Sequence, residues 1–175
     1  DPGVNELGKK IAERKLYDRD KSKELFVSRV KKLYEIAKNL GITLMIENNV
    51  LSKNNSLEFS SNPLLMCVPE ECNEVLNNLP EGVKLLIDVA HLKVSANSLN
   101  YNPKKMFQMC ENRIGGYHLS DNNGLSDTNN PFNSEAWFWR YINPSINYIS
   151  IEVYSPDINL LLEQRKLTKL KLNIK

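Results

Sequence analysis

The sequence reads VKLLIDVAH at residues 83–91, an apolar run that ends at Asp88 and is followed closely by His91. Three other apolar runs carry a carboxylate or an imidazole near their ends: ITLMIE (residues 42–47), IGGYHL (114–119) and YISIEV (148–153). The residues concerned are Glu47, Asp88, His118 and Glu152, which are 41, 30 and 34 residues apart. A strand with its following helix needs roughly 30 residues or more. The spacing therefore predicts four successive strand–helix units.

The segments between the runs support this interpretation. Residues 21–40 form the strongest predicted helix, because apolar side chains recur there at helical spacing and Gly41 follows. Strands alternating with helices predict an α/β fold with a parallel sheet, and Gly115 with Gly116 predicts a bulge or a close backbone approach. Further helices are expected at residues 69–79, 103–110, 135–141 and 158–172, and a short helical turn at residues 5–12. Loops are expected at residues 48–61, 89–102 and 120–131, the last with room for a very short strand.

The composition predicts a soluble globular protein and argues against several other classes. The chain has 175 residues, of which 41% are hydrophobic and 25% charged, and a net charge of +2. These values predict one soluble globular domain, and such a small charge makes a nucleic-acid partner unexpected. Three cysteines without C-x-x-C spacing argue against disulfides and structural zinc, so we expect a cytoplasmic location. No apolar stretch approaches the roughly 20 residues that span a bilayer, so no membrane contact is expected.

The four strand-end residues form a candidate metal site. In a barrel of parallel strands, the strand ends meet at one mouth, and carboxylates gathered there repel one another unless protons or a cation neutralise them. Hard oxygen ligands with one imidazole suit Mn²⁺, Mg²⁺, Co²⁺ or Zn²⁺. Taken alone, Glu47 could be a solvated strand end, Asp88 a helix cap and His118 a core residue. Their recurrence in successive units instead predicts a divalent metal ion bound by Glu47, Asp88, His118 and Glu152.

The motifs around these residues resemble those of a known group of proteins. Glu47-Asn48, Asp88-Val89-Ala90-His91, His118-Leu119-Ser120-Asp121-Asn122 and Ile151-Glu152-Val153 are similar, in order and spacing, to the strand-end motifs of xylose isomerase-like barrels. That group holds sugar-phosphate isomerases and epimerases and the endonuclease IV type of apurinic-site nuclease. The resemblance covers about residues 21–171 and implies a (β/α)8 TIM barrel. A complete barrel typically takes about 250 residues, so we expect residues 1–175 to be a single domain, the C-terminal part of an incomplete barrel. A companion segment or chain would supply the N-terminal strands.

The resemblance also implies a function. In the ketose epimerase branch, the residues like Glu47, Asp88, His118 and Glu152 bind one divalent ion, and the two glutamates exchange protons at the carbon next to a carbonyl. His91 would contact the substrate there, and Asp121 would orient its hydroxyl groups. The expected function is therefore a divalent-metal-dependent isomerase or epimerase of a sugar or sugar phosphate.

Two alternatives remain open from the sequence. In the nuclease branch the residue like His91 binds zinc, together with an Asp-x-His pair, but this chain has Asp127-Thr128-Asn129 at the matching place. An amide in place of the imidazole weighs against a three-zinc phosphodiesterase. The arginine that epimerases often carry after the histidine motif is also missing from Asn122-Asn123-Gly124. A non-catalytic sugar-binding barrel is compatible with these losses and with the aromatic residues 137–139, although we expect those rings to pack in the core.

Overall fold

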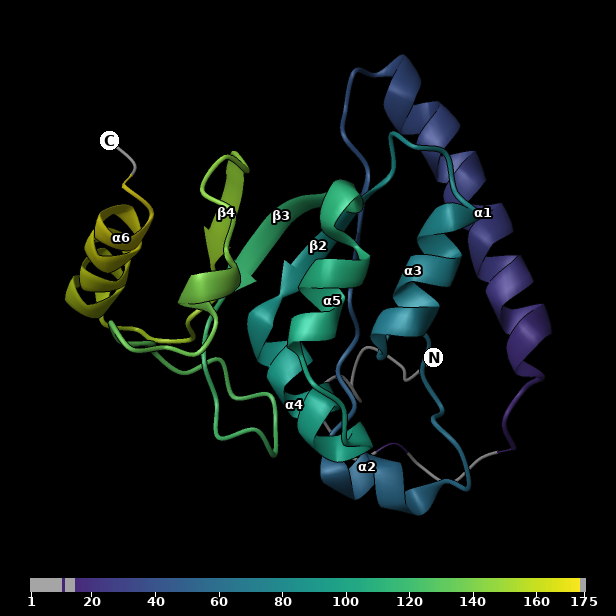
Figure 1. Cartoon of the computed structure of the whole chain (residues 1–175), viewed down its shortest axis with the longest axis horizontal. Helices are drawn as coiled ribbons and strands as arrows, with labels where there is room; N and C mark the ends of the chain where they lie inside the picture. The colour runs from purple at the N-terminus through teal and green to yellow at the C-terminus, as the bar shows by residue number, and fades with distance from the viewer. Residues whose placement is uncertain (1–10, 12–14, 174–175) are drawn as a thin grey trace.

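Four parallel strands form one sheet (Figure 1): β1 (Met45–Glu47), β2 (Lys84–Asp88), β3 (Ile114–Leu119) and β4 (Tyr148–Ile151). Their order in space is their order along the chain. The computed structural model describes residue 11 and residues 15–173, so the turn expected at residues 5–12 lies outside the described residues apart from Ile11. All four predicted strands are confirmed, although β1 begins three residues later than its apolar run and β4 ends two residues earlier.

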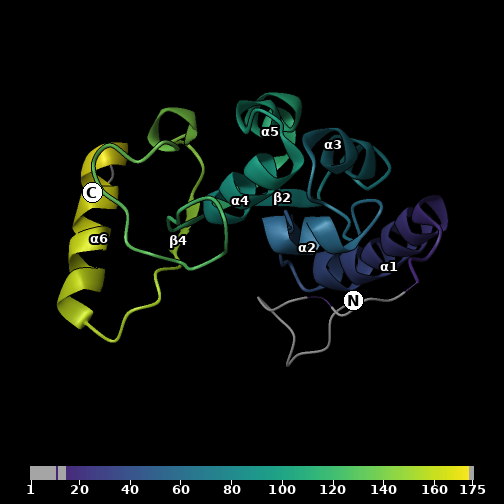
Figure 2. The same cartoon turned by 90° about the horizontal axis from the view of Figure 1, so that it is seen from below.

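Helices connect the strands, and the two that precede β2 and β3 lie side by side along the sheet (Figure 2). Helix α1 precedes β1, two helices lie between β1 and β2, two between β2 and β3, and α6 follows β4. The helices are α1 (Arg19–Asn39), α2 (Lys53–Glu58), α3 (Pro69–Asn77), α4 (Val89–Leu99), α5 (Lys104–Met109) and α6 (Ile158–Leu172). Helices α1, α3, α5 and α6 confirm predictions, whereas only the 3-10 turn η3 (Trp139–Tyr141) forms within the helix expected at residues 135–141. Another 3-10 turn, η2 (Glu111–Arg113), leads into β3.

Two predicted loops are wrong in part, because they contain α2 and α4. Helix α4 follows β2 directly, and the Asp88 side chain caps it by accepting a hydrogen bond from the His91 backbone N–H at 2.7 Å. The Ser and Asn residues of α4 have weak helix propensity. Leu92 and Ser95 of this helix are nevertheless fully buried against the rest of the protein. The Ser95 hydroxyl accepts a bond from the Leu51 N–H at 3.0 Å. Tertiary packing therefore overrides the local preference.

The register of the strands puts the four candidate ligands on one face of the sheet. Asp88 pairs with His118, and His118 pairs with Ser150. Glu47 pairs with Leu86, two residues before Asp88, and Glu152 lies two residues beyond Ser150. Since side chains alternate between faces along a strand, these positions all point to the same side.

Glycine allows β3 to fit between its neighbours. The register shifts between Leu85, which pairs with Ile114, and Leu86, which pairs with Gly116, so Gly115 is the extra residue of a bulge. A Cβ on Gly116 would lie 2.7 Å from Tyr148 Cδ1. The bulge and close approach expected from the two glycines are therefore confirmed.

The main core lies between the opposite face of the sheet and the helices. Fully buried side chains of β2 and β3 pack there with α3 and α5, among them Leu85, Ile87, Tyr117, Leu119, Leu76 and Met106. Phe138 is also fully buried and meets Phe132 edge-to-face at 5.6 Å, so the aromatic segment packs in the core as expected. All three cysteines are free and buried. None of the described helices has the length and apolar character needed to cross a membrane.

Candidate metal centre

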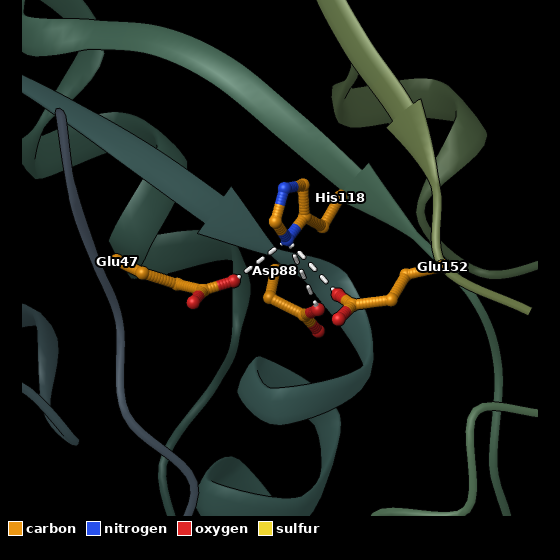
Figure 3. Close-up of side chains that lie close together, drawn as sticks. All are labelled: Glu47, Asp88, His118 and Glu152. Carbon is orange, nitrogen blue, oxygen red and sulfur yellow. Dashed lines mark ion pairs between the residues drawn. The ribbon is translucent and has the colours of Figure 1, made fainter.

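Each candidate ligand lies at the C-terminal end of a different strand. Glu47 is the last residue of β1 and Asp88 the last of β2, while His118 precedes the last residue of β3. Glu152 follows β4 directly, and its backbone N–H donates to the Leu119 carbonyl at 2.9 Å, which continues the pairing of β4 with β3. Because parallel strands end at the same edge of a sheet, four segments distant in sequence deliver their side chains to one place (Figure 3).

The four side chains form one compact group. One potential ligand atom from each residue lies within 4.8 Å of the others. His118 Nδ1 is central: it is 2.8 Å from Glu47 Oε1, 2.9 Å from Glu152 Oε2 and 4.0 Å from Asp88 Oδ2. Glu47 and Glu152 approach it from opposite sides (Figure 3). The structure therefore brings together all four residues that the sequence pattern singles out.

The donor set fits a divalent cation. Asp88 Oδ2, His118 Nδ1 and Glu152 Oε2 are buried, and none of them makes a hydrogen bond within the described part of the chain, despite the short ion-pair distances. Buried polar atoms without hydrogen bonds are costly, and three carboxylates beside one imidazole carry excess negative charge when ionised. Three oxygen donors and one nitrogen donor match the preference of Mn²⁺, Mg²⁺, Co²⁺ or Zn²⁺ rather than that of a thiolate-bound ion. These residues could hold such an ion.

The close packing of these residues also raises the pKa values of two of them, Asp88 and His118. Burial raises the pKa of Asp88 from 3.8 to about 7, an effect that the neighbouring His91 partly offsets. Contact with the Glu47 carboxylate raises the pKa of His118 above 6.5, against the opposing effect of burial. Both groups therefore hold protons more tightly than usual, so protons and a cation compete for the same atoms.

A second layer of residues holds Asp88. The Asn48 side chain brackets its backbone: Oδ1 accepts from the Asp88 N–H at 2.8 Å, and Nδ2 donates to the Asp88 carbonyl at 3.1 Å. His91 Nδ1 lies 3.0 Å from the Asn48 carbonyl, and His91 Nε2 lies 3.2 Å from Asp127 Oδ2. Burial alone would lower the pKa of His91, but Asp127 and Asp88 outweigh it and raise the pKa to about 10. His91 lies outside the four-residue group, and both of its ring nitrogens contact oxygens of neighbouring residues. The sequence alone did not identify Asn48 and Asp127 as the partners of the His91 ring.

Asp121 is also outside the four-residue group. Its Oδ1 accepts from Lys93 Nζ at 2.6 Å and from the Asn122 N–H at 2.8 Å. Its backbone pairs with that of Asn130 in an isolated antiparallel bridge, the very short strand pairing for which residues 120–131 have room. In this arrangement the carboxylate anchors the segment after β3. Its expected contact with substrate hydroxyl groups remains a prediction.

Comparison with known proteins supports the fold. No protein-family model and no curated protein matches the chain. Among solved structures, it is similar to a protein from Rhodospirillum rubrum that is described as a "putative xylose isomerase", with a TM-score of 0.56 and 14% sequence identity. The match covers 85% of this chain and 53% of that one, so this chain spans about half the length of its structural neighbour. At this identity the likeness concerns the fold alone: the chain has the α/β architecture of part of a xylose isomerase-like TIM barrel.

Proposed function

We propose that this chain provides the metal-binding part of the active site of a sugar or sugar-phosphate isomerase or epimerase. The observation that carries the proposal is the convergence of Glu47, Asp88, His118 and Glu152, whose ligand atoms lie within 4.8 Å of one another at four successive strand ends. A divalent ion held by such a group polarises carbonyl and hydroxyl oxygens, which makes the neighbouring C–H bond more acidic. The fold similarity and the strand-end motifs support the same class of reaction.

Differences in burial suggest which of the four residues only bind the ion and which also transfer protons. The Asp88 side chain is fully buried and that of His118 is 19% exposed, which suits residues that only anchor an ion. The side chains of Glu47 and Glu152 are 36% and 30% exposed and lie on opposite sides of the group. Two carboxylates so placed are suited to remove a proton from one face of a sugar carbon and return it to the other. Glu47 and Glu152 are therefore the proposed acid/base pair.

The two alternatives have weaker support. A zinc-dependent phosphodiesterase would need the His91 imidazole as a ligand, but both of its nitrogens already face acceptors, Asn48 and Asp127. A non-catalytic sugar-binding barrel gains nothing from the aromatic segment, because Phe138 is buried and Trp139 packs against Phe132 at 5.4 Å. The isomerase or epimerase proposal rests on the four-residue group and does not need His91 as a metal ligand.

We further propose that additional strands, from a companion segment or chain, complete the barrel. Among the described residues, β1 pairs only with β2 and β4 only with β3, so both outer edges of the sheet are open. Apolar side chains are exposed on the flanking helices, including Leu33 and Ile36 of α1 and Leu162 and Leu170 of α6. Open edges and exposed apolar groups favour association with further strands.

Solvent-proton exchange tests the proposed reaction. The protein would be incubated with Mn²⁺ and candidate ketoses or their phosphates in D₂O, and deuterium incorporation would be measured by mass spectrometry. An isomerase or epimerase introduces deuterium at the carbon next to the carbonyl, and Glu152→Gln should abolish this. Binding of a sugar without deuterium incorporation would favour a non-catalytic barrel, and cleavage of an abasic duplex would favour the nuclease.

A further inference from the structure

The segment after β3, residues 120–131, is joined to the first turns of α4 by several side chains. Lys93 Nζ donates to Asp121 Oδ1 at 2.6 Å, and Asn122 Nδ2 donates to the Ala90 carbonyl at 3.0 Å. Farther along, Asn97 Nδ2 donates to the Gly124 carbonyl at 2.8 Å. These bonds hold residues 121–124. The next part of the segment contacts α4 through the His91–Asp127 pair at 3.2 Å.

The His91 ring has no nitrogen left for a metal or a substrate. Nδ1 faces a carbonyl oxygen, that of Asn48, and Nε2 faces a carboxylate oxygen, that of Asp127. Each ring nitrogen is therefore already engaged with an oxygen of a neighbouring residue, at 3.0 Å for Nδ1 and 3.2 Å for Nε2. The ring is mostly shielded from solvent, with 18% of the side chain exposed. In this arrangement neither nitrogen is free to bind a cation, because each one contacts an oxygen of Asn48 or Asp127.

These contacts continue to the proposed metal ligand Asp88. Asp127 contacts His91 Nε2, and His91 Nδ1 contacts the Asn48 carbonyl. The Asn48 side chain in turn forms hydrogen bonds of 2.8 and 3.1 Å with the backbone N–H and carbonyl of Asp88. The His91 backbone N–H also fixes Asp88 Oδ1 at 2.7 Å, which leaves Oδ2 for the four-residue group. Residues that hold ligands in this way commonly change metal affinity by roughly 10–100-fold when they are replaced.

The geometry points to a positioning role for His91 and Asp127: together they form a latch that ties residues 125–131 to α4 and, through Asn48, fixes the orientation of Asp88. In this arrangement His91 is neither a metal ligand nor a substrate contact. The inference rests on the proposed function in one respect, namely that the four-residue group binds a divalent ion. The latch itself is a property of the metal-free chain.

Mn²⁺ binding tests the positioning role. Asp127→Ala and His91→Ala should each weaken Mn²⁺ binding about tenfold or more, and the double variant should bind about as weakly as the weaker single one, because both residues act through the same contact. Pulsed electron paramagnetic resonance should detect one Mn²⁺-bound imidazole nitrogen, from His118, in the wild type and all variants. Asp127→Asn, which keeps an acceptor oxygen, should recover most of the affinity. Loss of a bound nitrogen in His91→Ala, or unchanged affinity in Asp127→Ala, would overturn the inference.

Hydrogen exchange in EDTA tests the latch without metal. The Asn130 N–H donates to the Asp121 carbonyl at 2.7 Å, and the Tyr154 N–H donates to the Asn129 carbonyl at 2.9 Å. Asp127→Ala should accelerate exchange of these two amides about tenfold. The Gly124 amide, bonded to Asn122 Oδ1 at 2.9 Å, lies within the part held by other contacts and should not change.

A matched control separates the latch from a general loss of charge. Glu135 is exposed, and the described residues include no side-chain hydrogen bond or ion-pair partner for it, so Glu135→Ala removes one negative charge from the segments after β3 and should leave both measurements at their wild-type values. Unchanged exchange at Asn130 and Tyr154 in Asp127→Ala would refute the latch whatever the Mn²⁺ result. A wild-type protein that binds no Mn²⁺, but whose exchange responds as expected, would refute the proposed function and leave the latch in place.

Discussion

We expect Asp88→Asn to stabilise the metal-free protein at pH 8 and to weaken its binding of Mn²⁺. Asp88 is fully buried, and its Oδ2 makes no hydrogen bond within the described chain. Asparagine has nearly the same shape and is an equally good helix cap, so it can still accept the His91 N–H bond at the start of α4. The substitution therefore removes a buried carboxylate, together with its approach to His118 Nδ1 at 4.0 Å, and leaves the cap of α4 in place.

The magnitude follows from the pKa. Burial raises the pKa of Asp88 from 3.8 to about 7, so the folded protein binds this proton more tightly than the unfolded chain does. The contribution of Asp88 to the free energy of unfolding is then highest below about pH 4, falls as the pH rises through the window between the two values, and falls no further above about pH 7. A tenfold difference in proton affinity corresponds to about 1.4 kcal/mol, so ionised Asp88 costs up to about 4 kcal/mol at pH 8. The neutral amide of the variant would not incur this cost.

Urea denaturation in EDTA measures the effect. At pH 8 the Asp88→Asn variant should exceed the wild type in free energy of unfolding by up to about 4 kcal/mol, and at pH 5 the gain should shrink to less than half of that. Asp157→Asn is a matched control, because Asp157 caps α6 by accepting from the Asn159 N–H at 2.9 Å but is exposed. It should show no pH-dependent gain. A variant less stable than the wild type at pH 8, or equally stabilised at both pH values, would refute the reasoning.

The metal centre, the sheet and the cysteines each give one further prediction. Mn²⁺ affinity should fall as the pH is lowered from 8 to 6, because the pKa values of His118 and Asp88 are both raised and bound protons must leave; calorimetry in buffers of different ionisation enthalpy counts them, and pH-independent affinity would argue against the site. Gly116→Ala should cost about 1–3 kcal/mol in urea denaturation, because its Cβ would lie 2.7 Å from Tyr148 Cδ1 and 3.1 Å from the Tyr148 carbonyl oxygen; an unchanged midpoint would contradict the close approach. Burial raises the pKa of the Cys67 thiol to about 12, and all three cysteines are buried, so a disulfide reagent at pH 8 should label them only in unfolded protein; rapid labelling of any thiol in the folded state is the contrary result.

The four ligand positions could be predicted from sequence because they depend on repeated local patterns. Each strand is a short apolar run, which distinguishes it from the amphipathic helices around it. Once the strands are parallel and consecutive, their ends must share one edge, whatever the details of packing. Asp88 and His118 are even paired directly in the register. Strand order and strand ends were therefore sufficient to predict this cluster.

The second layer could not be predicted in the same way, because it depends on the path of the connections. Helix α4 was missed because Ser95, Asn97 and Ser98 resemble loop residues, although Asp88 was recognised as a possible cap. Asp127 reaches His91 only after the segment following β3 has folded back onto α4. No local pattern encodes that contact, since long loops lack the periodicity that reveals helices and strands.

The choice between aspartate and glutamate at the four positions follows from the topology of the sheet. Neighbouring strands lie about 4.8 Å apart, so the outer strands β1 and β4 are separated by roughly 14 Å before curvature is considered. The central strands β2 and β3 supply Asp88 and His118, whereas the outer strands supply Glu47 and Glu152. Glutamate is one methylene longer than aspartate, and this length lets both outer carboxylates reach His118 Nδ1, at 2.8 and 2.9 Å. Such extended side chains also keep their carboxylates partly exposed, as proton transfer to a bound molecule requires. The anchors are therefore central and less exposed, and the proposed acid/base pair is peripheral and more accessible, because a curved parallel sheet delivers them in that order.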